Sequence, residues 1–305
     1  MVEQVLNQWK MARVTKGCTN DKPERNVLMP YLTVGKENSS DINLYYEDHG
    51  AGKPVVLIHG WPLSGQSWEK QTSALVAAGH RVITYDRRGF GLSDKPVFGY
   101  DYDTFAADLH QLITKLDLRD VTLAGFSMGG GEVARYLGKY GSDRVKKAVF
   151  IAAIPPFLLK TPDNRLGVDA EIFEGIKQAI IADRPGFLAK FLALFFNVDV
   201  LGGKLVSDQA VQACWNIASG ASPKGSLDCV TAWLTDFRKD LATFTVPTLV
   251  VHGDADRIVP LAASAQRVHE MVKGSRLVVI EGAPHGLNWT HADQLNRALL
   301  DFLGK

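Results

Sequence analysis

Residues 121–137, VTLAGFSMGGGEVARYL, decide the fold of this chain. An apolar run of strand type stops at Ser127, meets a cluster of glycines, and continues with helical spacing. The segment Gly125–Gly129 fits the pattern G-x-S-x-G, in which a sharp strand-to-helix turn exposes a serine hydroxyl above a sheet. The free N–H groups at the start of the helix favour a developing negative charge there. The stretch therefore predicts that Ser127 is a catalytic nucleophile.

Strand and helix patterns alternate along the rest of the chain. Strands followed by helices indicate parallel pairing with right-handed crossovers and helices on both faces of the sheet. We therefore expect an α/β fold with a mostly parallel, doubly wound sheet. The predicted strands lie at 43–47, 54–60, 81–86, 121–127, 145–154, 247–253 and 276–283, and the predicted helices at 67–80, 102–118, 130–141, 261–272 and 291–303.

Residues 155–243 interrupt this alternation with helical runs that are rich in aromatic residues. We interpret the segment as a helical cap inserted between the two halves of the sheet, in an α/β core formed by 29–154 and 244–305. Ligands of open α/β sheets bind beyond the carboxyl ends of the strands, so a cap there would enclose a pocket. The alternative is a helical subdomain without a role in the chemistry. Residues 1–28 are expected to form a loosely held extension, or else a short docked helix.

The composition is that of an ordinary globular protein, with 305 residues, 46% of them hydrophobic, and a net charge of +1. This charge gives no reason to expect nucleic acid or an acidic membrane as a partner. The three cysteines are far apart and suit neither a metal site nor a disulfide framework, as is typical of a cytoplasmic protein. We find no secretory signal and no apolar run long enough to span a membrane.

A serine needs a base, and in this fold class the acid and then the histidine follow the nucleophile along the chain. His285 lies in a turn directly after the strand pattern at 276–283, so it is the predicted base. Asp254 and Asp256 both follow the preceding strand, and either could orient the imidazole. We favour Asp256, because Asp254 is better placed to bond within its own turn.

The remaining site residues are predicted from their positions. The backbone N–H groups of Met128 and Trp61 are the candidate oxyanion donors, since Pro62 has no N–H. Phe157 and Ile258 are candidate lining residues of an acyl pocket, with ordinary packing as the alternative. The cap aromatics Phe195, Phe196 and Trp233 are expected to belong to the core rather than to contact substrate.

Five motifs together resemble the α/β-hydrolase fold, and more narrowly its cofactor-free haloperoxidases, which are also called non-heme chloroperoxidases, perhydrolases or aryl esterases. The resemblance covers the chain from about Met29 to its end. It implies the same catalytic residues and oxyanion donors, no cofactor, and no metal. The motifs are HGWPLSGQSW (59–68), YDRRGFGLSDKP (85–96), GFSMGGGEVARY (125–136), HGDADRIVP (252–260) and EGAPHGLNWTHADQLN (281–296).

The resemblance also implies a reaction. A small ester or carboxylic acid would acylate the serine, and water would release the acid or hydrogen peroxide would release a peracid that oxidises a halide. The Trp61–Pro62 pair is similar to that of perhydrolase-like members, which favours peroxide, and relatives are often homo-oligomers. A plain esterase, a lactonase or a γ-lactamase would share the triad and remains the alternative. A non-enzymatic binding module predicts a damaged triad, whereas all three residue types are present.

Overall fold

The computed structural model describes residues 30–304, and the predicted extension 1–28 lies outside them. Eight strands form a single sheet in the order β1-β2-β4-β3-β5-β6-β7-β8. The six strands from β4 to β8 in this order pair in parallel with their neighbours. At the other edge, β1 pairs antiparallel with β2, and β2 pairs antiparallel with β4. The strands are β1 Tyr31–Glu37, β2 Ser40–His49, β3 Pro54–Ile58, β4 Arg81–Tyr85, β5 Val121–Phe126, β6 Val145–Ile151, β7 Thr248–Gly253 and β8 Arg276–Ile280.

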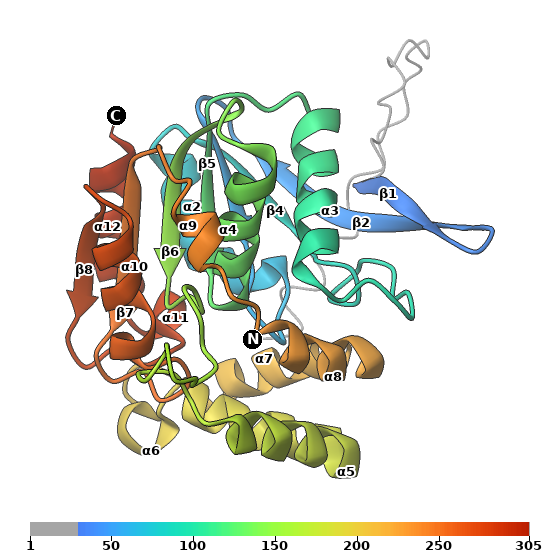
Figure 1. Cartoon of the computed structure of the whole chain (residues 1–305), viewed down its shortest axis with the longest axis vertical. Coiled ribbons are helices and arrows are strands. Elements are labelled where there is room, and N and C mark those ends of the chain that lie inside the picture. Colours follow the sequence, from blue (N-terminus) through green and yellow to red (C-terminus); the bar gives the residue numbers. More distant parts are fainter. Residues whose placement is uncertain (1–29, 305) are drawn as a thin grey trace, which may run out of the picture.

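The expected α/β fold with a mostly parallel sheet is confirmed. The antiparallel edge departs from the parallel pairing that alternation predicts. No helix separates β1 from β2, and Asn38, with φ of 54°, lies in the short turn that joins them. A connection this short permits only a hairpin. Figure 1 shows this hairpin projecting from one side of the molecule.

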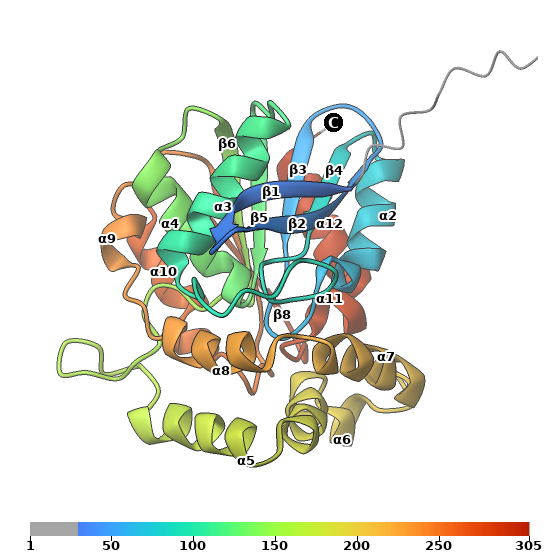
Figure 2. The same cartoon turned by 90° about the vertical axis from the view of Figure 1, so that its right-hand side faces the viewer.

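Helices cover both faces of the sheet. Helices α2 and α12 lie on one face, while α3, α4 and α10 lie on the other (Figure 2). Strands β5 and β7 are buried along their whole length, as their continuous apolar sequences predict. The elements outside the 155–243 segment are η1 Gly65–Trp68, α2 Glu69–Ala77, α3 Tyr102–Lys115, α4 Met128–Tyr140, η2 Leu261–Ala263, α10 Ala265–Met271, α11 Leu287–Thr290 and α12 Ala292–Leu303.

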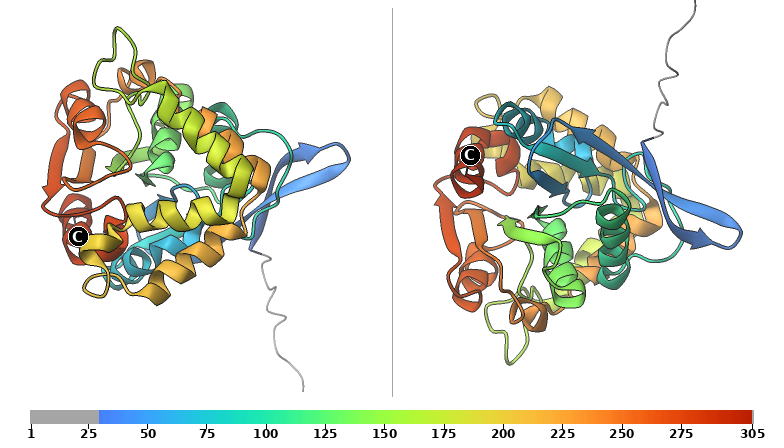
Figure 3. Two further views of the ribbon diagram at one scale, coloured as in Figure 1. Left: turned by 90° about the horizontal axis from the view of Figure 1, so that it is seen from below. Right: turned by 90° about the horizontal axis from the view of Figure 1, so that it is seen from above.

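The segment between β6 and β7 is helical, and all of its helices except the last lie across the carboxyl ends of the parallel strands (Figures 1 and 3). The last one, α9, packs against α4. Its longest helix, α5, bends at Asp183, whose side chain accepts a hydrogen bond of 3.0 Å from the N–H of Gly186. Polar contacts fix the segment to loops of the sheet: the N–H of Gly286 donates to the carbonyl of Phe195 at 2.8 Å. The helices are α5 Ala170–Phe195, α6 Val198–Leu201, α7 Asp208–Ser219, α8 Pro223–Ala232 and α9 Arg238–Leu241.

Candidate active site

Ser127 occupies the turn between β5 and α4 and has the strained backbone angles φ 54° and ψ −119°. The positions on either side of it must be glycine, because other backbone segments pass too close to leave room for a side chain. A Cβ on Gly125 would lie 2.4 Å from the carbonyl oxygen of Gly129, and one on Gly129 would lie 2.4 Å from that of Ile58. The turn therefore holds the serine at the carboxyl edge of the sheet, beside the end of β3.

His285 and Asp256 lie at the same edge and form a continuous chain of hydrogen bonds with Ser127. The Oγ of Ser127 is 2.8 Å from Nε2 of His285, and Nδ1 of His285 is 2.7 Å from Oδ2 of Asp256. The imidazole is fully buried, with the rings of Phe126 and Phe195 each centred 5.1 Å from it. The structure thus brings together the three residues that sequence order selected, in the geometry of a nucleophile, a base and an orienting acid.

The Asp256 carboxylate is held by backbone donors as well. Its Oδ1 accepts hydrogen bonds from the N–H groups of Ile258 at 2.8 Å and Val259 at 2.9 Å. Burial opposes ionisation, but His285 and His252 outweigh it and hold the pKa of Asp256 well below its usual range. The side chain is therefore a fixed anion facing the His285 ring.

His252 also lies at the site, although its position at the end of a strand made it a weaker candidate for the base than His285. Its Nε2 lies 3.2 Å from Oδ2 of Asp256 and 2.9 Å from the carbonyl oxygen of Val259. The sequence feature that could have indicated this role is the position of His252 at the end of a strand, four residues before Asp256. We expected Asp254 to bond within its own turn. Its carboxylate instead accepts a hydrogen bond of 2.7 Å from the N–H of Gly282, in the turn after β8.

The two candidate oxyanion donors lie on the segments that flank Ser127. Met128 is the first residue of α4, and Trp61 follows β3 in a turn where the N–H of Leu63 donates to the carbonyl of Gly60 at 3.1 Å. In the stretch 30–304, neither the N–H of Trp61 nor that of Met128 donates to a backbone carbonyl. Both groups are therefore available to an acceptor bound near Ser127.

A cavity of about 340 Å³ opens above Ser127, and its lining is almost entirely apolar. Ile258 lines it, as predicted. Phe157 does not: its ring packs beneath the guanidinium of Arg238, 5.1 Å away, and the neighbouring Leu158 faces the cavity instead. The Phe157 prediction is therefore wrong, because the irregular loop after β6 turns that side chain away.

Helix α5 contributes several of the lining residues, and Trp233, the residue directly after α8, contributes another. Trp233 belongs to the buried core, as expected. It also lines the cavity and packs edge-on against Trp61, with ring centroids 5.1 Å apart. Phe195 packs on Phe196 and on the His285 ring, and neither phenylalanine lines the cavity. The charged lining residues are Lys190 and Arg257.

Within residues 30–304, no group of three or more His, Cys, Asp or Glu side chains is arranged to hold a metal ion. The same part of the chain contains no helix with the length and apolarity needed to cross a membrane.

A buried Ser–His–Asp chain at the carboxyl edge of a mostly parallel sheet, beneath inserted helices, defines an α/β hydrolase. In agreement, residues 53–292 match the alpha/beta hydrolase fold family. A Synechocystis sp. protein with the provisional name non-heme chloroperoxidase is 64% identical over 275 residues, which cover 90% of this chain and all of the relative. The chain belongs to the α/β-hydrolase family, within the group of the non-heme haloperoxidases.

Two further proteins are similar to this chain over most of its length. The crystal structure of a bromoperoxidase from Bacillus anthracis superimposes with a TM-score of 0.86 at 55% identity, covering 90% of this chain and 98% of that one. A bifunctional esterase/perhydrolase from Acinetobacter calcoaceticus is 35% identical over 279 residues, covering 90% of this chain and 99% of the relative. Proteins named as a bromoperoxidase and as an esterase/perhydrolase are thus each similar to this chain over 90% of its length.

Proposed function

We propose that the protein is a serine hydrolase that forms an acyl-enzyme from small esters or carboxylic acids and transfers the acyl group to water or hydrogen peroxide. The observation that carries the proposal is the unbroken Ser127–His285–Asp256 hydrogen-bond chain at the floor of an apolar cavity. The similarity to a bromoperoxidase and to an esterase/perhydrolase supports the use of peroxide.

In the first half-reaction, Nε2 of His285 takes the hydroxyl proton while Oγ of Ser127 attacks the carbonyl carbon. The N–H groups of Trp61 and Met128 stabilise the negative charge on the carbonyl oxygen. The tetrahedral intermediate then collapses, and the imidazolium returns its proton to the leaving alcohol or water. Asp256 stabilises the imidazolium and fixes the tautomer that carries the proton on Nδ1.

In the second half-reaction, His285 removes a proton from the incoming nucleophile, which attacks the acyl-enzyme. Water gives the carboxylic acid, and hydrogen peroxide gives the peracid; either step restores the Ser127 hydroxyl. The peracid, a halide ion and a proton then yield a hypohalous acid and the carboxylic acid, so the halide is oxidised by two electrons as the peroxide bond is reduced. The chain's own residues are needed only up to the release of the peracid.

The test compares the wild-type protein with Ser127→Ala, following hydrolysis of p-nitrophenyl acetate and peroxide-dependent bromination of monochlorodimedone in acetate buffer. The exposed Ser73→Ala on α2 is the matched control. We expect both activities to disappear in Ser127→Ala and to persist in the control.

Other outcomes change the proposal in defined ways. Hydrolysis without bromination would leave an esterase and remove the peroxide step. Wild-type protein without either activity would overturn the small-acyl proposal and direct the search to lactones and lactams. If Ser127→Ala kept either activity, the serine would not be its nucleophile.

A further inference from the structure

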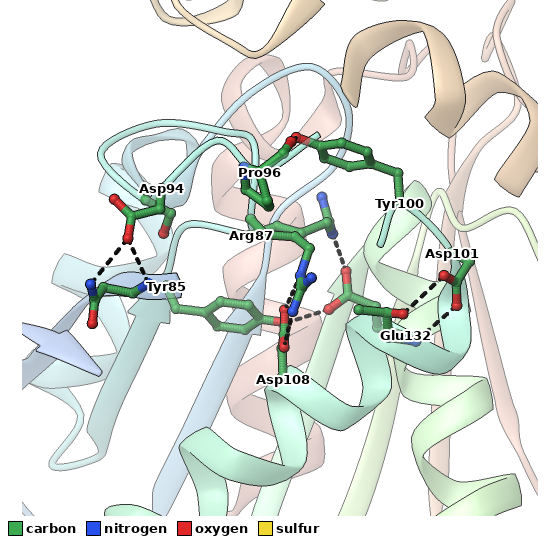
Figure 4. A network of polar contacts seen from close by, with 12 residues as sticks. Tyr85, Arg87, Asp94, Pro96, Tyr100, Asp101, Asp108 and Glu132 are labelled. Carbon is green, nitrogen blue, oxygen red and sulfur yellow. Dashed lines mark hydrogen bonds and ion pairs between the residues drawn. The ribbon is translucent and has the colours of Figure 1, made fainter. Parts of the chain in front are cut away.

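Arg87 and Glu132 form an ion pair that is closed to solvent, with side chains 1% and 0% exposed. The hydroxyl of Tyr85 also donates to the Glu132 carboxylate. Figure 4 shows Tyr85 and Arg87, from the end of β4 and the residues after it, converging on Glu132 of α4. Burying both charges costs desolvation free energy, so such a pair is weak evidence for a role in stability.

Arg87 connects this pair to the loop that carries Trp61. Its Nη2 donates to the carbonyl of His59 at 2.8 Å, and its backbone N–H donates to Nε2 of His59 at 3.0 Å. The Nδ1–H of His59 in turn donates to the carbonyl of Gly60 at 2.9 Å. Burial and the Arg87 charge hold the pKa of His59 well below its usual range, so the ring stays neutral in this one tautomer. His59 lies two residues before Trp61, and both its backbone and its ring are therefore held by Arg87.

Glu132 connects the same pair to the nucleophile turn. It lies on α4, four residues after Met128, so the two residues are neighbours along the helix surface. The start of α4 also touches the loop directly, because a Cβ on Gly129 would lie 2.9 Å from the carbonyl oxygen of His59. The spacing between the loop and the helix is thus set by a backbone contact on one side and by the ion pair on the other.

We propose that the Arg87–Glu132 pair, acting through His59, is a positioning device that sets the separation of the two oxyanion donors, the N–H groups of Trp61 and Met128. The inference rests on the proposed function, since it assumes an oxyanion at that place. Donors that fit the transition state better than the bound substrate raise kcat and leave KM nearly unchanged. Loosening the pair should therefore lower kcat, and should weaken the binding of an analogue that carries the oxyanion.

The chain offers a matched control in the next residue. Arg88 forms a bidentate pair with Asp108 of α3, at 2.6 and 2.7 Å, and both side chains are buried. The side-chain hydrogen bonds of Arg88 within 30–304 end on Asp108 and do not reach residues 59–61 or α4. Loss of this pair removes a buried ion pair of the same type without touching the oxyanion donors.

The experiment pairs Glu132→Gln with Asp108→Asn, and Arg87→Lys with Arg88→Lys. For each folded variant, kcat and KM for p-nitrophenyl acetate, the inhibition constant of phenylboronic acid and the midpoint of thermal unfolding are measured. The boronic acid forms a tetrahedral adduct with the nucleophile and so reports on the oxyanion donors. We expect Glu132→Gln and Arg87→Lys to lower kcat about 10- to 100-fold, with little change in KM and a parallel weakening of the boronic acid. The control variants should show lower unfolding midpoints but wild-type kcat and inhibition.

Two results would overturn the inference. One is wild-type kcat in Glu132→Gln and Arg87→Lys; the other is an equal loss of kcat in the control pair, which would assign the effect to general destabilisation. If either variant does not fold, the milder Tyr85→Phe takes its place, since it removes only one donor to Glu132. Activity that survives Ser127→Ala would instead mark a failure of the proposed function, so the two failures are distinguishable.

Discussion

His252 contacts the same carboxylate oxygen of Asp256 that bonds to His285: its Nε2 lies 3.2 Å from Oδ2. The other oxygen accepts two backbone N–H groups, from Ile258 and Val259. The carboxylate is therefore surrounded by donors, and rotation about its Cβ–Cγ bond would break several hydrogen bonds at once. A carboxylate held this way gives the His285 ring one orientation.

Replacing His252 with Phe should lower kcat for p-nitrophenyl acetate about tenfold, because one donor to the catalytic anion is lost. KM should change little, since His252 does not line the cavity. His110→Phe is the control, as His110 stacks on Tyr140 with ring centroids 4.2 Å apart and does not line the cavity. Equal kcat in the two variants would show that the contact with Asp256 does not matter for catalysis.

The depressed pKa of Asp256 predicts how stability changes with pH. A carboxyl group whose folded pKa lies below its ordinary value of 3.8 stabilises the fold above that value, and the contribution is lost as pH falls through the folded pKa. The difference in unfolding free energy between wild type and Asp256→Asn should therefore be largest near neutral pH and should become smaller below about pH 4. Chemical unfolding from pH 2.5 to 7 measures it; a difference that is the same throughout this range contradicts the shift.

Sequence patterning could predict the sheet and the elements that carry the site, because each rests on local signals. The apolar runs that become β5 and β7 are buried along their whole length. The glycines of the Ser127 turn are explained by backbone that approaches so closely that an added Cβ would lie 2.4 Å from a carbonyl oxygen. The antiparallel edge was missed because alternation describes strands joined through helices, whereas β1 and β2 are joined by a short turn.

The cavity lining was harder to predict, since the direction of a side chain in an irregular loop follows no periodicity. Phe157 and Leu158 are adjacent and equally apolar, yet only Leu158 lines the cavity. Trp233 sits at the end of a helix with its ring against Trp61, more than 170 residues earlier in the chain, and no local pattern predicts that contact. The contact of His252 with Asp256 could not be predicted for the same reason, because it depends on how the turn between them folds.

Gly129→Ala should damage both stability and catalysis. The added methyl group would lie 2.4 Å from the carbonyl oxygen of Ile58 and would force α4 away from the loop that carries Trp61. We expect a loss of about 1–3 kcal/mol in unfolding free energy, as for overpacked interiors, together with a lower kcat. The control is Gly175→Ala on α5, where the methyl group meets nothing within 4 Å and should stabilise the helix by about 0.5–1 kcal/mol. A Gly129→Ala variant with wild-type stability and kcat would contradict this account of the turn.

Trp233→Ala should shift the acyl-chain preference of the enzyme toward longer chains. The indole lines the apolar cavity and packs on Trp61, so its removal extends the space above Ser127. A longer acyl chain can bury its added methylene groups in that space, at about 0.8 kcal/mol each, whereas an acetyl group gains nothing. The ratio of kcat/KM for p-nitrophenyl octanoate over acetate should rise about tenfold, and using the ratio cancels any general loss of activity. Phe157→Ala removes a buried ring that does not line the cavity, so it should lower stability and leave the ratio unchanged. A change of the ratio in Phe157→Ala but not in Trp233→Ala would place the acyl chain elsewhere.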